Sequence, residues 1–393
     1  MELSALQTMA LGILALLTGG LLNSWLGVLR RICIPSPVTG GLVFSLVTLV
    51  LYKFYGIEIK FDETLKDICM IVFFTSVGLQ SDLKLLKRGG RPLIVLVILV
   101  AILIIFQNLI GIGLALGLGQ NPLLGMSAGS ITMSGGHGTA AGFSPLLESL
   151  GLSSAMTITM ATATFGLLGG SLIGGPLAEL IIRKKKLAHT AAVPTPPAHE
   201  VSNKDALSTS GYATATYIIF LAAGLGTLLS KLLSLTGLSF PVYFGSLIVA
   251  VIIRNCSESI AFIPKVPLPE IISIGSVSLS LFLGMAMISL KLWELAGIAL
   301  PLLAILIAQV LFMAVFARFV AFPLLGRDYD AAVIVSGLCG FGLGATPNAM
   351  ANMSAVCSKY RYTPGPFFLI PIIGAMFVDI INIAIITIFL NII

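Results

Sequence analysis

The chain has 393 residues, of which 57% are apolar and only 10% are charged, against roughly 25% charged in an average soluble domain. Together with a mean hydropathy of +1.07, this excludes a disordered chain and argues against a soluble globular domain. Five cysteines without a CxxC pair exclude a disulfide framework and give no support to a zinc site. The net charge of +6 does not indicate nucleic-acid binding, because the charges cluster in short gaps between long apolar runs. We therefore predict an all-α polytopic membrane protein.

Ten apolar segments are long enough to cross a bilayer, whose ~30 Å core needs about 20 helical residues. They lie at about 5–28, 38–55, 66–83, 92–118, 155–182, 213–235, 240–256, 268–290, 299–325 and 366–390. Two further stretches, about 121–150 and 328–358, are apolar but rich in Gly, Ser, Thr and Pro. We do not count these two stretches as ordinary spans.

The positions of Lys and Arg set the expected orientation, because basic residues concentrate on the cytoplasmic side. If both termini lie outside and each glycine-rich stretch enters and leaves on one side, 17 of the 22 basic residues lie inside. The five left outside are Lys53, Lys60, Lys66, Lys231 and Lys291. Counting both stretches as full spans would instead place the run from Arg183 to Lys186 outside, so we favour ten spans.

Two halves of five spans flank a polar connection in which three prolines prevent a continuous helix. We predict a first repeat at 1–182, a cytoplasmic linker at 183–212 and a second repeat at 213–393. Five spans is an odd number, so the second half runs opposite to the first, as in the inverted repeats of secondary transporters. Chance similarity between apolar helices is the alternative. The motifs that recur at offsets near 205 are Pro37-Val38 with Pro241-Val242, Asp82-Leu83-Lys84 with Ser289-Leu290-Lys291, and Gly136-His137-Gly138 with Gly342-Leu343-Gly344.

Each glycine-rich stretch predicts a re-entrant hairpin, because a Gly costs about 1 kcal/mol relative to Ala in a helix. Broken backbone at membrane depth must be buried in protein or line a cavity, so we expect the two tips to meet near the middle. Backbone N–H groups there attract a carboxylate, and carbonyl oxygens ligate a small cation. Close packing is the alternative role, and the expected one for Gly166, Gly170 and Gly174. The candidate substrate-binding residues are Ser134, Gly135, Gly136, His137, Gly138, Thr139, Gly340, Phe341, Gly342, Gly344, Thr346, Pro347 and Asn348.

Polar side chains within the apolar runs are further candidates. Asp379 lies near the middle of the last span, where an ionisable group is a functional candidate by default. Asn382 follows one turn later on the same face, and with Thr132 these residues form the candidate cation site. His137 is expected to contact substrate, relay protons or bond a hairpin carbonyl. Hydrogen bonds between helices, rather than ligand contacts, are expected for Gln107, Asn108 and Gln309.

These motifs resemble those of the bacterial sodium/glutamate symporters. The similar stretches are Ser134-Gly135-Gly136-His137-Gly138-Thr139, Gly340-Phe341-Gly342-Leu343-Gly344-Ala345-Thr346-Pro347, and Ser278-Leu279-Ser280-Leu281-Phe282-Leu283 leading to Leu290-Lys291-Leu292-Trp293-Glu294-Leu295-Ala296. The resemblance extends from Ile34-Pro35 to Asp379 and leaves the linker uncovered.

The resemblance implies Na⁺-coupled uptake of L-glutamate at the bacterial cytoplasmic membrane, with Na⁺ as the coupling ion. It also implies alternating access by a homodimer, in which a mobile transport domain carries both hairpins past a fixed scaffold. A carrier for another organic anion, coupled to Na⁺ or H⁺, is the alternative. A channel is a third option, which saturable counterflow would distinguish from a carrier. A membrane-embedded hydrolase using Ser134 and His137 is less favoured, because the glycines between these residues argue against a shared helix face and the sequence has no HExxH motif.

The predicted topology is testable by labelling cysteines introduced one at a time. Residues at positions 88 and 200 are expected to react only from the cytoplasm, and one at position 235 only from outside, because of the asymmetry of the basic residues. Accessibility of positions 88 and 200 from opposite sides would refute the inverted arrangement.

Overall fold

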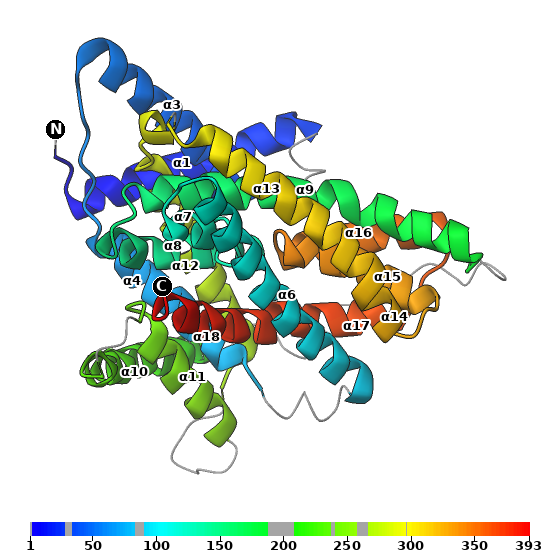
Figure 1. Ribbon diagram of the computed structural model, residues 1–393. Helices are drawn as coiled ribbons and strands as arrows, with labels where there is room; N and C mark the ends of the chain where they lie inside the picture. Colours follow the sequence, from blue (N-terminus) through cyan, green and yellow to red (C-terminus); the bar gives the residue numbers. More distant parts are fainter. Residues whose placement is uncertain are drawn as a thin grey trace. The chain divides into compact units, whose positions relative to one another are not determined.

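A computed structural model describes residues 2–27, 34–82, 90–187, 208–236, 240–257, 266–295 and 297–393 (Figure 1). The described chain is helical apart from turns, short connections and an isolated bridge between Glu2 and Lys60. This confirms the predicted all-α class. Positions 88 and 200 of the labelling experiment, and most of the predicted linker, lie outside the described residues.

Seven helices in the described chain are long and apolar enough to cross a membrane. They are α1 (Ala5–Trp25), α3 (Ser36–Tyr55), α6 (Gly90–Gly117), α9 (Ala155–Lys185), α10 (Thr209–Ser234), α12 (Leu268–Ile288) and the run Ala299–Leu324, which comprises α13 (Ala299–Phe316), a π-helical turn (Ala317–Ala321) and α14 (Phe322–Leu324). Each coincides with a predicted span.

The other three predicted spans are also helical, but they are shorter or interrupted. The first two are α4 (Thr64–Gln80), of 17 residues, and α11 (Phe244–Cys256), of 13 residues. The last consists of α17 (Pro364–Ile372), a π-helical turn (Ile373–Phe377) and α18 (Val378–Leu390). Such π-helical turns often occur at functional sites, and this one ends two residues before Asp379.

Both glycine-rich stretches form two helices separated by a break. In the first, α7 (Pro122–Ser127) and α8 (Gly136–Ser149) flank turns at 128–135; in the second, α15 (Tyr329–Gly342) and α16 (Thr346–Lys359) flank 343–345. An acceptor side chain caps the start of each stretch, since Asn121 accepts from the Leu123 N–H at 2.9 Å and Asp328 from the Ala331 N–H at 2.8 Å. The placement of these helices as re-entrant hairpins stays a prediction.

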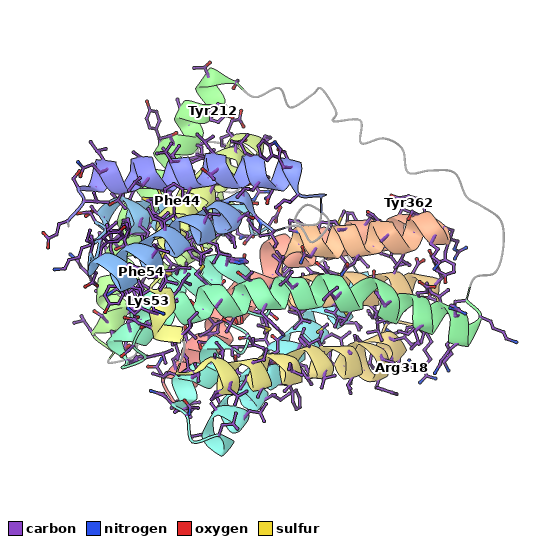
Figure 2. All side chains as sticks on the ribbon, turned by 90° about the horizontal axis from the view of Figure 1, so that it is seen from above. Phe44, Lys53, Phe54, Tyr212, Arg318 and Tyr362 are labelled. Atoms are coloured by element: carbon purple, nitrogen blue, oxygen red, sulfur yellow. The ribbon has the colours of Figure 1, made fainter. Side chains whose placement is uncertain are left out.

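The described chain divides into two compact units that do not follow the two halves of the sequence. The first contains α1, α3 and α4 from the first half and α10, α11 and α12 from the second. It also contains most of α8, the start of α9 and a short 3₁₀ helix (Leu292–Leu295). The C-terminal end of α3, marked by Lys53 and Phe54 in Figure 2, belongs to this unit.

Helix packing within this first unit has the same pattern in both halves. α1 packs on α3 as α10 packs on α11, and α3 packs on α12 as α11 packs on α4, while α4 and α12 pack on each other. Exchanging α1 with α10, α3 with α11 and α4 with α12 therefore leaves this set of pairs unchanged.

Glycine pairs produce the closest of these crossings. A Cβ on Gly19 would meet the Gly40 nitrogen at 2.7 Å, which lets α1 and α3 approach backbone to backbone. The corresponding crossing of α10 and α11 uses Gly226 and Gly245, where a Cβ on Gly226 would overlap Ser246. The spacing from Gly19 to Gly226 and from Gly40 to Gly245 matches the offset near 205 between the recurring motifs.

The second unit contains α6, α7, the turns at 128–135, the start of α8 up to Ala140, most of α9, and α13 to α18. Within it α6 packs on α7, α13 and α18, and α15 packs on α16 and α17. Arg318, in the π-helical turn after α13, lies toward the end of its helix in Figure 2 with its guanidinium 5.5 Å from the Phe319 ring. Every glycine-stretch residue predicted to bind substrate belongs to this unit.

Gly226→Val is expected to lower the melting temperature of the purified protein in detergent, because an added side chain at a close crossing costs about 1–3 kcal/mol in overpacking. Gly224→Val is the matched control, since it lies on the same helix with no described atom within 4 Å of an added Cβ. Equal melting temperatures for the two variants would contradict the crossing.

Candidate functional site

The two glycine-rich stretches touch within the second unit. Gly136, the first residue of α8, has a φ of 58°, a left-handed conformation that side chains disfavour. A Cβ there would lie 2.7 Å from the carbonyl oxygen of Gly344, which lies two residues before the start of α16. The N-termini of α8 and α16 therefore lie beside one close backbone contact.

Gln107 on α6 joins the two stretches by hydrogen bonds. Its Nε2 donates to the Gly342 carbonyl at 2.7 Å, and its Oε1 accepts from the Ser134 hydroxyl at 2.7 Å. The backbone carbonyl of Gln107 in turn accepts from Gln309 Nε2 on α13, also at 2.7 Å. All three side chains are buried. The expectation that Gln107 and Gln309 hydrogen-bond between helices is confirmed.

Ser130 lies in the first break and is held by side chains from two helices. Its N–H donates to Asn108 Oδ1 at 2.8 Å, and its carbonyl accepts from Asn382 Nδ2 at 3.0 Å. The same carbonyl accepts from the Gly135 N–H at 2.9 Å. A Cβ on Gly135 would lie 2.7 Å from Asn382 Nδ2 and 2.5 Å from Thr139 Cβ. Asn382, Thr139 and Ser130 thus converge around one turn of backbone.

The second break packs on α9 through two asparagines of α16. Asn348 Nδ2 donates to the Leu167 carbonyl and Asn352 Nδ2 to the Gly170 carbonyl, both at 3.0 Å. A Cβ on Gly166 would touch Leu343 oxygen, and one on Gly170 would lie 2.8 Å from Cys339 oxygen. These α9 glycines, with Gly174, therefore have the close-packing role expected for them.

Asp379 is the one charged residue placed along the middle of a predicted span of this unit; its other described charges lie at or near helix ends or in connecting segments. Its side chain is half-buried, and it has no hydrogen bond or ion pair within the described residues. A Cβ on Gly374, in the π-helical turn before it, would lie 2.5 Å from Thr346 Oγ1. This turn therefore adjoins the start of α16.

The predicted site residues differ in their exposure and in their hydrogen-bond partners. The side chain of Phe341 is 2% exposed, Thr132 donates its hydroxyl to the Ser127 carbonyl at 2.8 Å, and Pro347 is exposed. His137 is buried, with Nε2 3.1 Å from Thr164 Oγ1. Since Ser134 bonds Gln107 instead, His137 and Ser134 form no nucleophile–base pair, which disfavours the hydrolase alternative.

Several buried polar atoms of this unit have no hydrogen-bond partner among the described residues. They are Asn108 Nδ2, Ser130 Oγ, Thr139 Oγ1, Gln309 Oε1, Asn348 Oδ1 and Asn382 Oδ1. Unpaired buried polar atoms are rare in native proteins and call for an explanation such as a bound ion or water. Ser130 was not among the sequence candidates, because a single serine in a glycine-rich run gives no periodic signal.

A group of three or more His, Cys, Asp or Glu side chains able to hold a metal ion is absent from the described residues. The oxygens without a described partner in this unit belong to hydroxyl and amide side chains, and Asp379 is the charged residue of α18. Oxygen ligands of this kind suit hard monovalent and divalent cations rather than zinc or copper.

Comparisons with known proteins identify the family of the chain. The sodium/glutamate symporter family model matches residues 1–362. A sodium/glutamate symporter of Escherichia coli strain K12 is 42% identical over 99% of this chain and 98% of its own length. One of Haemophilus influenzae is 39% identical over 97% and 96%.

Among solved structures, the sodium proton antiporter MjNhaP1 from Methanocaldococcus jannaschii is 16% identical, with 98% of this chain and 97% of that chain covered and a TM-score of 0.45. The sequence relatives, in contrast, match over nearly their full length at about 40% identity. The resemblance predicted from the glycine-rich motifs is thus confirmed, and the chain belongs to the sodium/glutamate symporter family.

Proposed function

We propose that this protein couples the entry of Na⁺ to the uptake of L-glutamate across a bacterial cytoplasmic membrane. The relatives named above are symporters, so the chain is a transporter rather than an enzyme. The observation that carries the proposal is the contact of Gly136 with Gly344 oxygen, where two broken helices meet beside buried polar side chains. Discontinuous helices that meet in this way form the substrate sites of many secondary transporters.

The two helix N-termini at this contact suit an amino acid with two carboxylates. The first N–H groups of a helix lack partners within that helix, and the helix dipole favours an anion there. α8 begins at Gly136, and α16 begins at Thr346. Gly135, Gly138 and Thr346 are only partly buried, so backbone and hydroxyl groups remain accessible at both starts. We place the substrate along these residues, together with the other predicted residues of the two stretches: Ser134, Gly136, His137, Gly340, Phe341, Gly342, Gly344, Pro347 and Asn348.

The cation belongs on the α18 side of the same unit. Asp379 supplies an unpaired carboxylate, and Asn382 contacts the first break through Ser130. Moving the net negative charge of glutamate into the cell costs about 2.3 kcal/mol per 100 mV, and each Na⁺ returns the same amount. At least two Na⁺ ions are therefore needed before the membrane voltage itself drives uptake.

The wider architecture proposed for the chain follows the sequence analysis. We propose two inverted repeats at 1–182 and 213–393, joined by a cytoplasmic linker, with re-entrant hairpins at 121–150 and 328–358 and both termini outside. The exchange of helix pairs in the first unit and the paired crossings at Gly19–Gly40 and Gly226–Gly245 support a repeat. A homodimer in which the second unit moves as the transport domain follows from the family resemblance.

Uptake into vesicles that contain only this protein tests the proposal. An inward Na⁺ gradient is expected to drive accumulation of labelled L-glutamate, and replacing Na⁺ by choline to abolish it. Unlabelled glutamate loaded inside is expected to accelerate entry by counterflow, which a channel does not show. Uptake that ignores Na⁺, or that requires only a proton gradient, would overturn the proposal.

Gly136→Ala tests the contact between the two breaks. The left-handed backbone costs an alanine about 1–2 kcal/mol, and its Cβ would also press on Gly344 oxygen. Uptake is expected to fall at least about tenfold, since a displacement of about 1 Å at a site has effects of this size or more. Gly119→Ala is the control, because Gly119 has a similar φ of 67° and no described atom within 4 Å of an added Cβ. If uptake falls equally in both variants, the loss is due to backbone strain alone and not to the contact between the two breaks.

Asp379→Asn tests the cation assignment, because it keeps the size of the side chain and removes the charge. The Na⁺ concentration for half-maximal uptake is expected to rise strongly, with partial recovery at high Na⁺. Weaker glutamate binding at every Na⁺ concentration, with an unaltered Na⁺ midpoint at saturating glutamate, would instead assign Asp379 to the substrate ammonium. Measuring Na⁺ curves at several fixed glutamate concentrations separates the two outcomes.

A further inference from the structure

Three buried oxygens around the first break have no assigned role and no described partner: Ser130 Oγ, Thr139 Oγ1 and Asn382 Oδ1. The three residues are at most 1% exposed. Burying a hydroxyl or amide oxygen without a hydrogen bond is unfavourable, because the oxygen loses its bonds to water and gains none in the protein. Three such atoms around one turn therefore indicate a ligand that replaces the missing bonds.

The three side chains are held around Gly135 by bonds that leave these oxygens unused. Asn382 donates its Nδ2 to the Ser130 carbonyl, which fixes its amide while its Oδ1 stays unpaired. Asn382 Nδ2 and Thr139 Cβ lie within 2.7 Å and 2.5 Å of the same point, the place of a Cβ on Gly135. A side chain at Gly135 would fill the space between them, which accounts for a glycine there.

We propose that Ser130 Oγ, Thr139 Oγ1 and Asn382 Oδ1 together ligate a monovalent cation of Na⁺ class, with Asn108 as a positioning residue for Ser130. Neutral oxygens at a helix break replace part of the hydration shell of such an ion. The charge that makes the site favourable comes from Asp379, one turn before Asn382 on the same face of α18. The site therefore involves Thr139 with the cation rather than with the substrate.

This inference rests on the proposed function, because it takes Na⁺ as the coupling ion. It also assigns different roles to the hydroxyl groups of Thr132 and Ser130. The Thr132 hydroxyl donates to the Ser127 carbonyl at 2.8 Å and so is already partnered, whereas the Ser130 hydroxyl is not.

The test measures the melting temperature of the purified protein as a function of Na⁺, without glutamate, at constant ionic strength kept with choline. A bound ion stabilises the folded protein by an amount that grows with the logarithm of its concentration above Kd. Ser130→Ala and Thr139→Val are expected to raise the Na⁺ concentration for half-maximal stabilisation at least about tenfold, since each variant loses an oxygen ligand and bonds to charged groups are stronger than bonds between neutral groups. The same variants are expected to melt no lower than the unaltered protein when Na⁺ is absent, because each removes an unpaired buried hydroxyl.

Two variants that remove paired hydroxyls serve as matched controls. Ser336 donates to the Val333 carbonyl at 2.9 Å, and Thr387 donates to the Ile383 carbonyl at 2.8 Å. Ser336→Ala and Thr387→Val are therefore expected to lower the melting temperature without Na⁺ and to leave the Na⁺ midpoint unchanged.

An unchanged Na⁺ midpoint in both Ser130→Ala and Thr139→Val would overturn the cation site and assign these oxygens to bound water. Stabilisation by K⁺ as large as that by Na⁺ would also overturn it. The proposed function fails separately, through absence of Na⁺-driven glutamate uptake by the unaltered protein. In that case, loss of the Na⁺-dependent rise in melting temperature in Ser130→Ala and Thr139→Val would still support the cation site.

Discussion

The buried side chain of Gln107 supports much of the candidate site, because it bonds to both breaks in the backbone. Lipid offers no hydrogen-bond partners, so a helix interrupted at membrane depth must be satisfied by protein groups. Gln107 accepts from Ser134 in the first break and donates to Gly342 at the second. Gln309 holds the backbone of Gln107 from α13. A polar residue on a very apolar helix thereby fixes two glycine-rich segments against each other.

Each half of the sequence also supplies hydrogen bonds to the interrupted helix of the other half, because the broken backbone must be satisfied by protein groups. The first break, in the first half, is bonded by Asn382 of α18, in the second half. The second break is bonded to α9 of the first half through Asn348 and Asn352. Each half therefore completes the backbone of the other half's interrupted helix, which explains why the second unit draws on both halves and not on one.

Hydropathy and length located all ten predicted spans on helices, because a membrane leaves few options for apolar segments of this size. Charge and polarity also selected Asp379 and Asn382 as candidates and predicted the interhelical hydrogen bonds of Gln107, since a polar group within an apolar run is conspicuous. The sequence did not reveal that α11 is only 13 residues long, or that π-helical turns interrupt two spans. Those features depend on packing against neighbouring helices, which no periodic pattern records.

The sequence predicted the residues of the candidate site but not the hydrogen bonds and contacts between them. Glycine content predicted where the helices break, and the breaks do touch at Gly136 and Gly344. Ser130 was missed because its importance comes from Asn108 and Asn382, which lie 22 and 252 residues away in the chain. Thr139 was assigned to the substrate by its position in a motif, whereas the proposed cation site rests on its unpaired oxygen and its closeness to Asn382.

The central claim is that a cation at the first break and a substrate at the two helix starts are energetically coupled, and linkage measures this directly. Calorimetric titration of glutamate into the purified protein at several fixed Na⁺ concentrations gives the factor by which Na⁺ strengthens glutamate binding. Titration of Na⁺ at several glutamate concentrations gives the converse factor, and for binding equilibria the two must agree. The account predicts tighter glutamate binding as Na⁺ rises, with a reciprocal effect of equal size. Glutamate binding of the same affinity in choline and in saturating Na⁺ would contradict it.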